Sequence, residues 1–560
     1  MTDTRTTTGA RFLAETLKGY GVTHIFYVDA ILRKTMVDFE ELGIRRVITH
    51  SEKAAAYMAD GYARVSHKPG VCLAQSVGAA NLAAGLQDAY LGRSPVIALT
   101  GKKPPMFQHR NAYQEIDHTP MFAPVTTFSA DVTSLEQFPH LLRQAFREAT
   151  TGTPRPVHLD LLGHNARMLE AAVADLPVVI EEAYTQYPPF RPEPDDASIQ
   201  AAAQAIAAAS RPVIVAGGGV RLSTAAAEVV ALAEKCDIPV ATSVNGKDSI
   251  LDRHPLSVGV VGSYSVRCAN QVVSEADLVI YVGSNTGDQV THSWRVPAQG
   301  TPIVQIDINP SEIGRSYPDV TPVLGDARQS LRKLAQAVAA GENKSWVEHV
   351  QTLVREWKAE MEPRRQSSET PILPERICKE ISEVLPENGV LVADTGYSAI
   401  WTATMVYLSH PNQIYLRAAG SLGWSFPASL GVKCAVPDRP VICFCGDGGF
   451  WYHLSELETA RRNNINTVTV VNNNGGLSQG IKDVHSVYGE RPGRPEELYQ
   501  FEPTNFAKIA QAMDCEGIRV ENPEDINDAI RQAMASDRPS VVEVITGLYH
   551  RAPDAWVPPT

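Results

Sequence analysis

Two polar side chains in the last third of the chain each follow an apolar run, and their types suit metal binding. Residues 441–445, VICFC, are uncharged and typical of a buried parallel strand, and Asp447 follows them in a glycine-rich turn. Residues 467–471, TVTVV, form a second such run, and Asn474 follows it. A helix-like segment lies between the two runs. The carboxyl ends of parallel strands meet at one edge of a sheet, where ligands bind.

The Asp447 carboxylate and the Asn474 amide are hard oxygen ligands of low total charge, and the carbonyl of Gly476 is a third candidate. Such a set suits Mg²⁺, which keeps its remaining positions for water or substrate phosphates. A helix N-terminus just after the first turn favours a diphosphate. Three glycines let the backbone approach such a ligand closely: Gly446, Gly448 and Gly449. The alternative is a pair of turns without a metal.

The spacing of these residues resembles a known motif. Asp447 and Asn474 are 27 positions apart (474 − 447), within Gly-Asp-Gly and Asn-Asn sequences. This resembles the thiamine-diphosphate motif of the superfamily that contains acetolactate synthase, benzoylformate decarboxylase, and oxalyl-CoA decarboxylase with 2-hydroxyacyl-CoA lyase. The resemblance implies thiamine diphosphate and Mg²⁺ as cofactors, with Asp447, Asn474 and Gly476 on the metal. It implies contacts to the cofactor from Gly446, Gly448, Gly449 and Asn474.

Glu52 opens an alanine-rich segment that reads as a helix. On composition alone it is a first-turn carboxylate stabilised by the helix dipole. The sequence around it, a His-Ser-Glu followed by Ala-Asp-Gly-Tyr-Ala-Arg at residues 59–64, resembles the family's glutamate helix. The resemblance implies that Glu52 is catalytic. It would bond the aminopyrimidine ring of the cofactor and promote the imino tautomer that takes the proton from thiazolium C2.

Four further residues of the first third are assigned by the same resemblance. Asn81 ends SVGAAN, which resembles a cofactor-binding Gly-Pro-Gly-Ala-Thr-Asn turn, although a helix cap is the simpler reading. Gln114 lies in Tyr-Gln-Glu, similar to Phe-Gln-Glu of acetolactate synthase, and is the second expected catalytic residue, near the thiazolium. Gln75 falls near a catalytic His position of benzoylformate decarboxylase. Ile31 lies in residues 29–34, which replace a Gly-x-Pro-Gly turn of most relatives, and both are substrate candidates.

The last third supplies the other expected contacts. Gly396 and Tyr397 follow a strand in a turn expected on the diphosphate side of the cofactor. Gly420 and Leu422 lie in RAAGSLG, which resembles the segment whose bulky residue wedges between the two cofactor rings. Acetolactate synthases commonly have Met at the position of Leu422. Three residues beyond the metal motif are substrate candidates, with an exposed loop as the alternative: His485, Tyr488 and Glu490.

Composition limits the classes of protein. The net charge of −13 argues against a nucleic-acid partner, and no run of 18 apolar residues predicts a membrane helix. The first residues, MTDTRTTTGARF, lack the apolar centre of a signal peptide. The eight cysteines form no CxxC pair and fit a reducing cytoplasm, which is the expected location. The expected partners are a small-molecule substrate and further copies of this chain, with no membrane.

A chain of 560 residues suggests about three domains. We expect an α/β fold in which each domain is a mostly parallel sheet flanked by helices. The expected segments are a pyrimidine-binding domain at 1–183, a linker at 184–198, a central domain at 199–340, a linker at 341–371 and a diphosphate-binding domain at 372–560. The resemblance implies a homodimer as the smallest active unit and a homotetramer as the assembly. Relatives use the central domain for FAD, for the ADP of CoA or for neither, and its lone glycine turn argues against FAD here.

The resemblance implies that a C–C bond beside a carbonyl is broken or formed through a C2 ylid and an enamine, on a 2-oxo acid or a 2-hydroxyacyl compound. Residues 470–480, VVNNNGGLSQG, look closer to the 2-hydroxyacyl-CoA lyase branch. Thr127 stands where acetolactate synthase often has Lys, and that synthase's Trp-containing segment is missing. We therefore rank a lyase or decarboxylase, with CoA esters among its substrates, above an acetolactate-synthase-type transferase. A catalytically silent paralogue is a further alternative.

Overall fold

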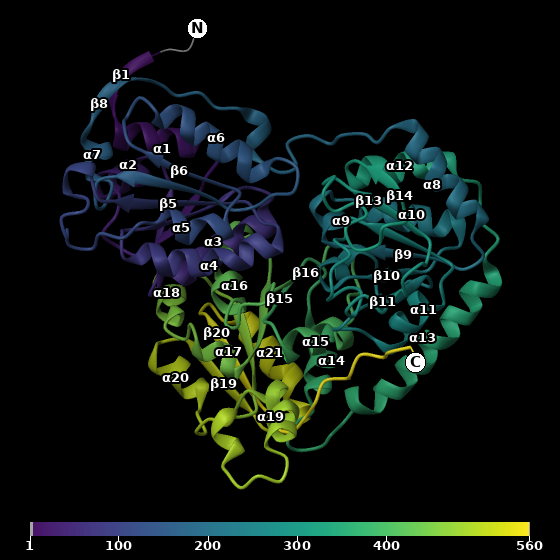
Figure 1. Cartoon of the computed structure of the whole chain (residues 1–560). Helices are drawn as coiled ribbons and strands as arrows, with labels where there is room; N and C mark the ends of the chain where they lie inside the picture. The colour runs from purple at the N-terminus through teal and green to yellow at the C-terminus, as the bar shows by residue number, and fades with distance from the viewer. Residues whose placement is uncertain (1–3, 559–560) are drawn as a thin grey trace.

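The computed structural model describes residues 4–558 and has three lobes, each built on one six-stranded sheet (Figure 1). All strand pairs within these sheets are parallel. Helices cover the sheet faces, as parallel sheets require because both faces are apolar. The expected α/β class is confirmed.

The first lobe has the strand order β3-β2-β4-β5-β7-β6. Its strands are β2 (His24–Tyr27), β3 (Arg45–Ile48), β4 (Gly70–Ala74), β5 (Val96–Lys102), β6 (Phe128–Val132) and β7 (Val157–Leu162). Its helices are α1 (Gly9–Gly19), α2 (Arg33–Glu41), α3 (Glu52–Ser66), α4 (Gly78–Gly92), α5 (Thr119–Phe122), α6 (Phe138–Thr150) and α7 (Arg167–Ala171). An antiparallel pair, β1 (Thr4–Thr8) and β8 (Val173–Pro177), lies beside this sheet.

The third lobe repeats this topology, with the order β16-β15-β17-β18-β20-β19. Its strands are β15 (Val390–Ala393), β16 (Ile414–Arg417), β17 (Val441–Gly446), β18 (Val468–Asn473), β19 (Glu516–Val520) and β20 (Ser540–Ile545). Its helices are α14 (Pro374–Val384), α15 (Tyr397–Met405), α16 (Ser425–Ala435), α17 (Asp447–Trp451), α18 (Glu456–Asn463), α19 (Ile481–Tyr488), α20 (Phe506–Ala512) and α21 (Ile526–Ala535). Counted from the start of each lobe, the strands of both sheets run 2-1-3-4-6-5.

The central lobe has a different order, β11-β10-β9-β12-β13-β14, which is that of dinucleotide-binding folds. Its strands are β9 (Pro212–Ala216), β10 (Val240–Thr242), β11 (Ser257–Val260), β12 (Leu278–Val282), β13 (Ile303–Asp307) and β14 (Val320–Leu324). Its helices are α8 (Asp196–Ala208), α9 (Gly218–Leu222), α10 (Ala226–Cys236), α11 (Arg267–Glu275) and α12 (Ala327–Ala337). The strand order reverses between β9 and β12, where such sheets open a crevice.

Most of the segment expected as the second linker is helix α13 (Lys344–Arg365). Its charged composition indicated a linker, but four apolar side chains recur at helical spacing and are buried: Trp346, Val350, Trp357 and Met361. This apolar stripe packs the helix on α11 and α14 and explains why it is ordered.

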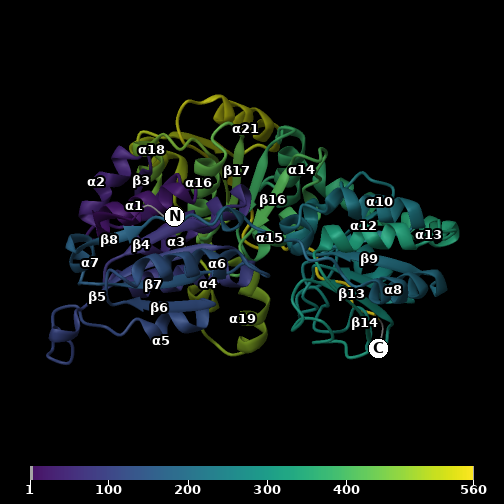
Figure 2. The same cartoon turned by 90° about the horizontal axis from the view of Figure 1, so that it is seen from above.

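The first and third lobes touch through α3 and α16, which lie side by side in both views (Figures 1 and 2). A Cβ atom at Gly61 would lie 2.1 Å from the carbonyl oxygen of Ala428, and one at Gly431 would lie 1.9 Å from that of Met58. Only glycine fits at these two positions. The helix that begins at Glu52 is therefore packed backbone to backbone on the third lobe of its own chain.

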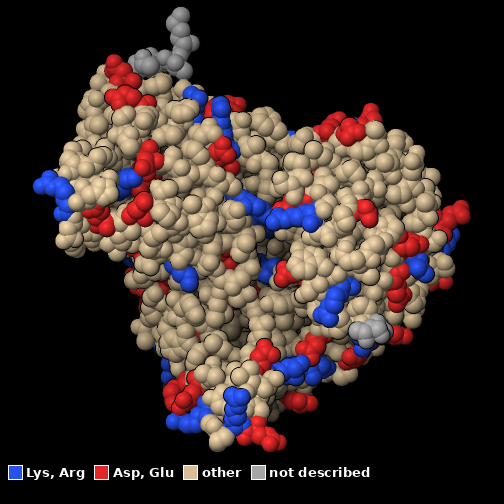
Figure 3. All heavy atoms as spheres, viewed as in Figure 1, with Lys and Arg blue, Asp and Glu red and all other residues tan. Residues whose placement is uncertain are grey.

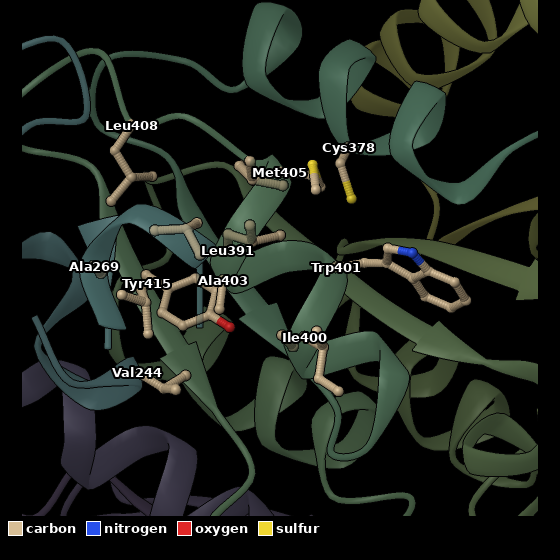
Figure 4. Close-up of a cluster of buried hydrophobic side chains, with 14 of the residues drawn as sticks. Val244, Ala269, Cys378, Leu391, Ile400, Trp401, Ala403, Met405, Leu408 and Tyr415 are labelled. Atoms are coloured by element: carbon tan, nitrogen blue, oxygen red, sulfur yellow. The ribbon is translucent and has the colours of Figure 1, made fainter. Parts of the chain in front are cut away.

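The central and third lobes share one buried core. Side chains from both lobes pack together, including Val244 and Ala269 from the central lobe and Leu391, Trp401 and Tyr415 from the third (Figure 4). Lys, Arg, Asp and Glu are interspersed on the face drawn in Figure 3. Within residues 4–558, no helix is both long and apolar enough to cross a bilayer.

Candidate functional site

Glu52 is the first residue of α3, directly after the cap residue Ser51, whose hydroxyl accepts a hydrogen bond from the Ala54 amide at 3.1 Å. The Glu52 carboxylate lies against Gly78, the first residue of α4. A Cβ atom at Gly78 would be 2.2 Å from Glu52 Oε1, so the carboxylate occupies the space that a side chain would need. Asn81 Nδ2 donates to Glu52 Oε2 at 3.1 Å.

The turn between β4 and α4 connects this carboxylate to the loop after β5. Ser76 Oγ donates to the backbone carbonyl of Gln114 at 2.6 Å. Gln114 is half-buried and has a positive φ of 59°, which is uncommon for a residue other than glycine. The Oε1 atom of Gln75, in the same turn, is buried without a hydrogen-bond partner. Glu52, Gln75, Asn81 and Gln114 thus gather at the carboxyl edge of the first sheet.

Ile31 lies apart from this group. It is 0 % exposed and packs in the core of the first lobe with Phe39 and Leu32. Within one chain its side chain offers no surface to a substrate. The segment that contains it has positive φ angles at two residues other than glycine, Ala30 and Leu32.

The third lobe holds the expected metal ligands together. Gly446 on β17 pairs with Asn472 on β18, so Asp447 and Asn474 follow adjacent strands. Asp447 is only 2 % exposed. Burial raises the pKa of Asp447 to about 6, opposed by backbone N–H donors that include Gly476 and Asn474. No Lys or Arg among residues 4–558 forms an ion pair with this buried carboxylate.

Asn474 differs from the two asparagines before it. Asn473 donates to Thr504 and Glu543, and Asn472 accepts from Thr546, so both are fixed within the sheet. Asn474 lies beyond the strand, where its Oδ1 accepts only from the Gly476 amide at 3.1 Å. A Cβ atom at Gly475 would meet no atom within 4 Å.

A buried aspartate organises the rest of this edge. Asp394 accepts from the amides of Thr395 and Gly423 and from the hydroxyl of Ser425, at 2.7, 3.1 and 2.7 Å. Burial raises its pKa to about 6. A Cβ atom at Gly449 would be 3.1 Å from Asp394 Oδ2 and 3.6 Å from Leu422 Cδ1, so Leu422 lies beside the metal turn.

The remaining predicted cofactor contacts lie at the same edge. Gly396, with a φ of 65°, precedes α15, and a Cβ atom there would meet Gln479 Oε1 at 2.5 Å. Tyr397 is the first residue of that helix. Gly420 has no atom within 4 Å of a Cβ position, but its amide donates to Asp88 of the first lobe at 3.2 Å.

The three distal substrate candidates lie on or just after α19. His485 is exposed and its Nε2 lies 3.2 Å from the hydroxyl of Tyr499. Glu490 is exposed, whereas the Tyr488 ring lies over Gly493. None of the three contacts the metal turn through a hydrogen bond among the described residues.

The two halves of the expected cofactor site lie on different lobes of the chain. Across residues 4–558, no hydrogen bond joins Glu52, Asn81 or Gln114 to Asp447 or Asn474. The first half presents groups suited to a ring, and the second presents oxygen ligands suited to a cation with a diphosphate.

Sequence reasoning missed three functional candidates. Asp394 is one of them, and it follows the buried strand β15 as Asp447 follows β17. Gln479 lies over Gly396, and Asp88 binds the segment that carries Leu422. Neither has a local sequence signal, because both act on residues far away in the chain.

The central lobe contains a cavity of about 430 Å³ at the reversal in its strand order. Its walls include the glycine turn after β9, the residues after β12, and Asp307 at the end of β13. Arg417 also lines it and is buried, and its guanidinium donates to the side-chain oxygens of Asn245 and Gln289. Burial lowers the pKa of Arg417, and the nearby Tyr415 and Asp88 oppose this shift.

Comparison with known proteins identifies the family. Residues 7–121, 199–334 and 394–544 match the family descriptions "Thiamine pyrophosphate enzyme, N-terminal TPP binding domain", "Thiamine pyrophosphate enzyme, central domain" and "Thiamine pyrophosphate enzyme, C-terminal TPP binding domain". The chain belongs to the thiamine-diphosphate-dependent enzyme superfamily. The resemblance drawn from the sequence motifs is therefore confirmed.

Members of this superfamily resemble the chain over nearly its full length. A "Probable acetolactate synthase large subunit" of Methanocaldococcus jannaschii is 34 % identical over 551 residues, 96 % of this chain and 91 % of that protein. The protein of the same name from Methanococcus aeolicus is 33 % identical, over 89 % of this chain and 85 % of its own. The "Acetolactate synthase large subunit" of Lactococcus lactis is 29 % identical, over 96 % of this chain and 92 % of that protein.

These relatives change our ranking of functions. The sequence motifs led us to place a 2-hydroxyacyl-CoA lyase above an acetolactate-synthase-type enzyme. The relatives that match nearly the full chain are named acetolactate synthase, so they support the acetolactate-synthase-type enzyme better than the lyase. The chain is accordingly a thiamine-diphosphate-dependent enzyme similar to acetolactate synthase.

Proposed function

We propose that this enzyme is a carboligase of the acetolactate synthase type, which joins two 2-oxo acids with loss of CO₂. The observation that carries the proposal is that both halves of a thiamine diphosphate site are intact in a chain whose relatives are acetolactate synthases along nearly their whole length. A catalytically silent paralogue would not need to retain Glu52 against Gly78 or a desolvated Asp447 between two strands.

The donor set of the third lobe fits Mg²⁺. Asp447, Asn474 Oδ1 and the Gly476 carbonyl would hold the ion, because one carboxylate and two neutral oxygens leave positions for diphosphate oxygens. The open space over Gly475 and the half-buried turn at Gly446 fit an approaching diphosphate. Bound thiamine diphosphate supplies a nucleophilic carbon that adds to a carbonyl and then accepts the electrons of the breaking C–C bond.

The residues of the chain then have separate tasks. Glu52 would share a proton with the aminopyrimidine ring of the cofactor, and Asn81 holds its carboxylate in place. Leu422, which lies beside Gly449, would support the bent form of the cofactor. Gln114 would orient the reacting carbonyl by hydrogen bonding, a role that depends on the position of its backbone. Thr127, in place of a lysine, leaves the contact to the second 2-oxo acid open.

We place the complete site between two copies of the chain, with a homodimer as the minimum and a homotetramer as the expected assembly. Glu52 belongs to the first lobe and Asp447 to the third, and the family resemblance implies that one cofactor meets these two lobes from different chains. Large apolar side chains that are at least 40 % exposed flank both halves: Met106, Phe107, Tyr113, Ile116, Trp451, Tyr452 and Leu477. Exposed apolar groups of this size commonly mark a protein interface.

Product analysis tests the carboligase proposal. Purified enzyme with thiamine diphosphate and Mg²⁺ would convert pyruvate to acetolactate and CO₂, and the same enzyme would leave a 2-hydroxyacyl-CoA uncleaved. Cleavage of the CoA ester without carboligation would instead support the lyase. Binding of the cofactor without turnover of either substrate class would support the silent paralogue.

The cavity of the central lobe favours a second cofactor. Its position at the reversal of strand order and the buried guanidinium of Arg417 in its wall both fit a dinucleotide such as FAD, whose phosphates would meet the guanidinium. The sequence argued against FAD because its glycine turn stands alone, whereas Asp307 at the end of β13 also lines this cavity. Flavin absorbance of purified protein, and its loss in Arg417→Met, would test this assignment.

A further inference from the structure

Two hydrogen bonds fix the side-chain amide of Asn474, which is expected to bind the metal. The backbone N–H of Gly476 donates to one end of this amide at 3.1 Å. A backbone N–H can only donate, so the atom that it meets is the oxygen Oδ1. The other end, Nδ2, donates to Ser478 Oγ at 3.1 Å. The amide therefore has a defined orientation, with its oxygen toward Gly476 and its nitrogen toward Ser478.

The backbone of Gly476 shows which side of this turn a cation would occupy. An antiparallel bridge pairs Gly476 with Gln500. Two backbone hydrogen bonds hold the residues on either side of Gly476: Leu477 N to Tyr499 O at 2.7 Å, and Phe501 N to Gly475 O at 2.8 Å. Because peptide groups are planar and trans, the N–H and the carbonyl of Gly476 both point to the opposite side, where Asn474 lies.

The carbonyl oxygen of Gly476 is available on that side. Among the hydrogen bonds of residues 4–558, none uses it as an acceptor. A Cβ atom at Gly476 would lie 2.2 Å from the carbonyl oxygen of Tyr499, so only glycine allows this close bridge. The Gly476 carbonyl thus lies on the same side as Asn474 Oδ1, which keeps a lone pair for a cation. Asp447 belongs to the same group, because the Gly476 N–H also reaches its carboxylate.

Ser478 lies in a short turn that packs against another element of the site. It is the first residue of the 3-10 turn η5 (Ser478–Gly480) and is 9 % exposed. The next side chain of this turn, Gln479, lies over Gly396 at the start of α15. This packing places the Ser478 hydroxyl at the nitrogen end of the Asn474 amide, opposite the end that is expected to bind the ion.

The two hydrogen bonds have different effects on the amide. The last torsion of an asparagine side chain has a broad energy profile, so one hydrogen bond leaves the plane of the amide free to swing. The Gly476 N–H decides which end is the oxygen, and the Ser478 hydroxyl fixes the plane. The direction of a ligand oxygen matters most for Mg²⁺, which demands a nearly ideal octahedral geometry, whereas Ca²⁺ accepts a flexible one.

We propose that Ser478 is a positioning residue of the metal site: it fixes the plane of the Asn474 amide, directs Oδ1 to the ion, and so makes the site prefer Mg²⁺ to Ca²⁺. Removing a group that orients a metal ligand commonly lowers the metal affinity by about 10-fold to 100-fold. The inference rests on the proposed metal site, and it does not depend on which reaction the enzyme catalyses.

Calorimetric titration with Mg²⁺ or with Ca²⁺, in the presence of saturating thiamine diphosphate, tests this role. Ser478→Ala should weaken Mg²⁺ binding by about 10-fold to 100-fold and Ca²⁺ binding by less than about threefold, because Ca²⁺ tolerates a displaced ligand. Ser478→Thr keeps the hydroxyl and should bind both ions as the wild type does. Ser478→Cys keeps the size of the side chain, but its sulfur is a weak acceptor, so its Mg²⁺ affinity should lie between those of wild type and Ser478→Ala.

Ser486→Ala is the matched control, because Ser486 is an exposed serine of α19, and both of its metal affinities should equal those of wild type. The unfolding temperature of every variant is measured with a chelator present, so that loss of folding is recognised. An equal loss of affinity for Mg²⁺ and Ca²⁺ in folded Ser478→Ala, or no loss for either ion, would overturn the proposal. Failure of the wild-type protein to bind thiamine diphosphate with either ion would overturn the proposed metal site as well.

Discussion

Asn81 donates a hydrogen bond of 3.1 Å to Glu52, so a residue expected to contact the cofactor also holds the expected catalytic acid. The carboxylate is fixed on its other side by Gly78, where no side chain fits. Both contacts come from the first two turns of α4, the helix that follows the central strand β4. The amide of Asn81 and the close approach of Gly78 thus fix the position of the Glu52 carboxylate.

Glu52→Gln should lower the rate of proton exchange at C2 of bound thiamine diphosphate by about a hundredfold to ten-thousandfold, the usual contribution of a positioned acid or base. The glutamine keeps the size of the side chain and its hydrogen bond to Asn81, but it cannot share a proton with the ring. Quenched-flow deuterium exchange followed by NMR of the released cofactor measures this rate directly.

Glu170→Gln supplies the control for that experiment. Glu170 is a buried carboxylate of the same lobe that accepts from the amide and hydroxyl of Thr35, both at 2.8 Å. A glutamine oxygen can still accept both bonds, so exchange at C2 should be unchanged. An exchange rate in Glu52→Gln equal to that of wild type would exclude the role assigned to Glu52.

Asp447 should make the affinity for Mg²⁺ depend on pH. Its pKa is raised to about 6 by burial, and a metal ion binds only the ionised carboxylate. Below about pH 6, the affinity for Mg²⁺ in the presence of thiamine diphosphate should therefore fall about tenfold per pH unit. Titration calorimetry at a series of pH values measures this slope. A flat profile down to pH values near 4 would contradict a raised pKa.

The raised pKa of Asp447 also predicts how the stability of the metal-free protein depends on pH. Because the pKa of Asp447 is higher when folded than its ordinary value of 3.8, the folded state binds more protons between these values, and stability decreases as pH rises through about 6. Above that pH the ionised, buried carboxylate costs about 3 kcal/mol. Asp447→Asn should therefore stabilise the metal-free protein at pH near 8 and leave it unchanged near pH 4, in denaturant unfolding with a chelator present.

The sequence was sufficient to predict which polar side chains lie together wherever they directly follow a strand. Asp447 and Asn474 each follow a short apolar run, and the rule that parallel strands bind ligands at their carboxyl ends placed them together. The same reasoning predicted the α/β class. Continuous apolar runs such as those of β17 and β18 have no polar face for solvent, so they are typical of parallel sheets covered on both sides.

Residues that act across the fold could not be predicted. Gln479 lies over Gly396, and Asp88 reaches a loop more than 330 positions away. Their partners depend on how helices and sheets pack, which no local pattern encodes. Helix α13 was wrongly predicted as part of a linker. The local pattern was available there, because four buried apolar side chains recur at helical spacing within residues 341–371.

Asp88 should be among the most sensitive positions in the structure. It is 1 % exposed, lies 2.9 Å from Arg64, and accepts the amides of Ala419, Gly420 and Ser421 from the third lobe. Asp88→Asn leaves the buried guanidinium of Arg64 with less compensation and removes acceptors from the segment that carries Leu422. The free energy of unfolding should fall by about 3 kcal/mol or more.

Asp29→Asn is the comparison for that variant. The Arg33–Asp29 pair has a similar N–O distance of 2.8 Å, but both side chains are 55 % exposed. Solvent screens such a pair, so its loss should change the free energy of unfolding by less than about 1 kcal/mol. Equal changes in the free energy of unfolding for the two substitutions would show that burial does not determine how much the Asp88 contacts stabilise the fold.

Mixing two inactive variants tests whether each site is shared between subunits. Glu52→Gln and Asp447→Asn should each be nearly inactive alone, because each removes one half of the site. In a mixed dimer, one of the two sites combines the intact Glu52 of one chain with the intact Asp447 of the other. Refolding or co-expressing equal amounts should therefore restore about a quarter of wild-type activity, since about half of the dimers are mixed and each has one good site. Restoration to that level requires a site between chains, whereas a site within one chain would leave the mixture as inactive as its components.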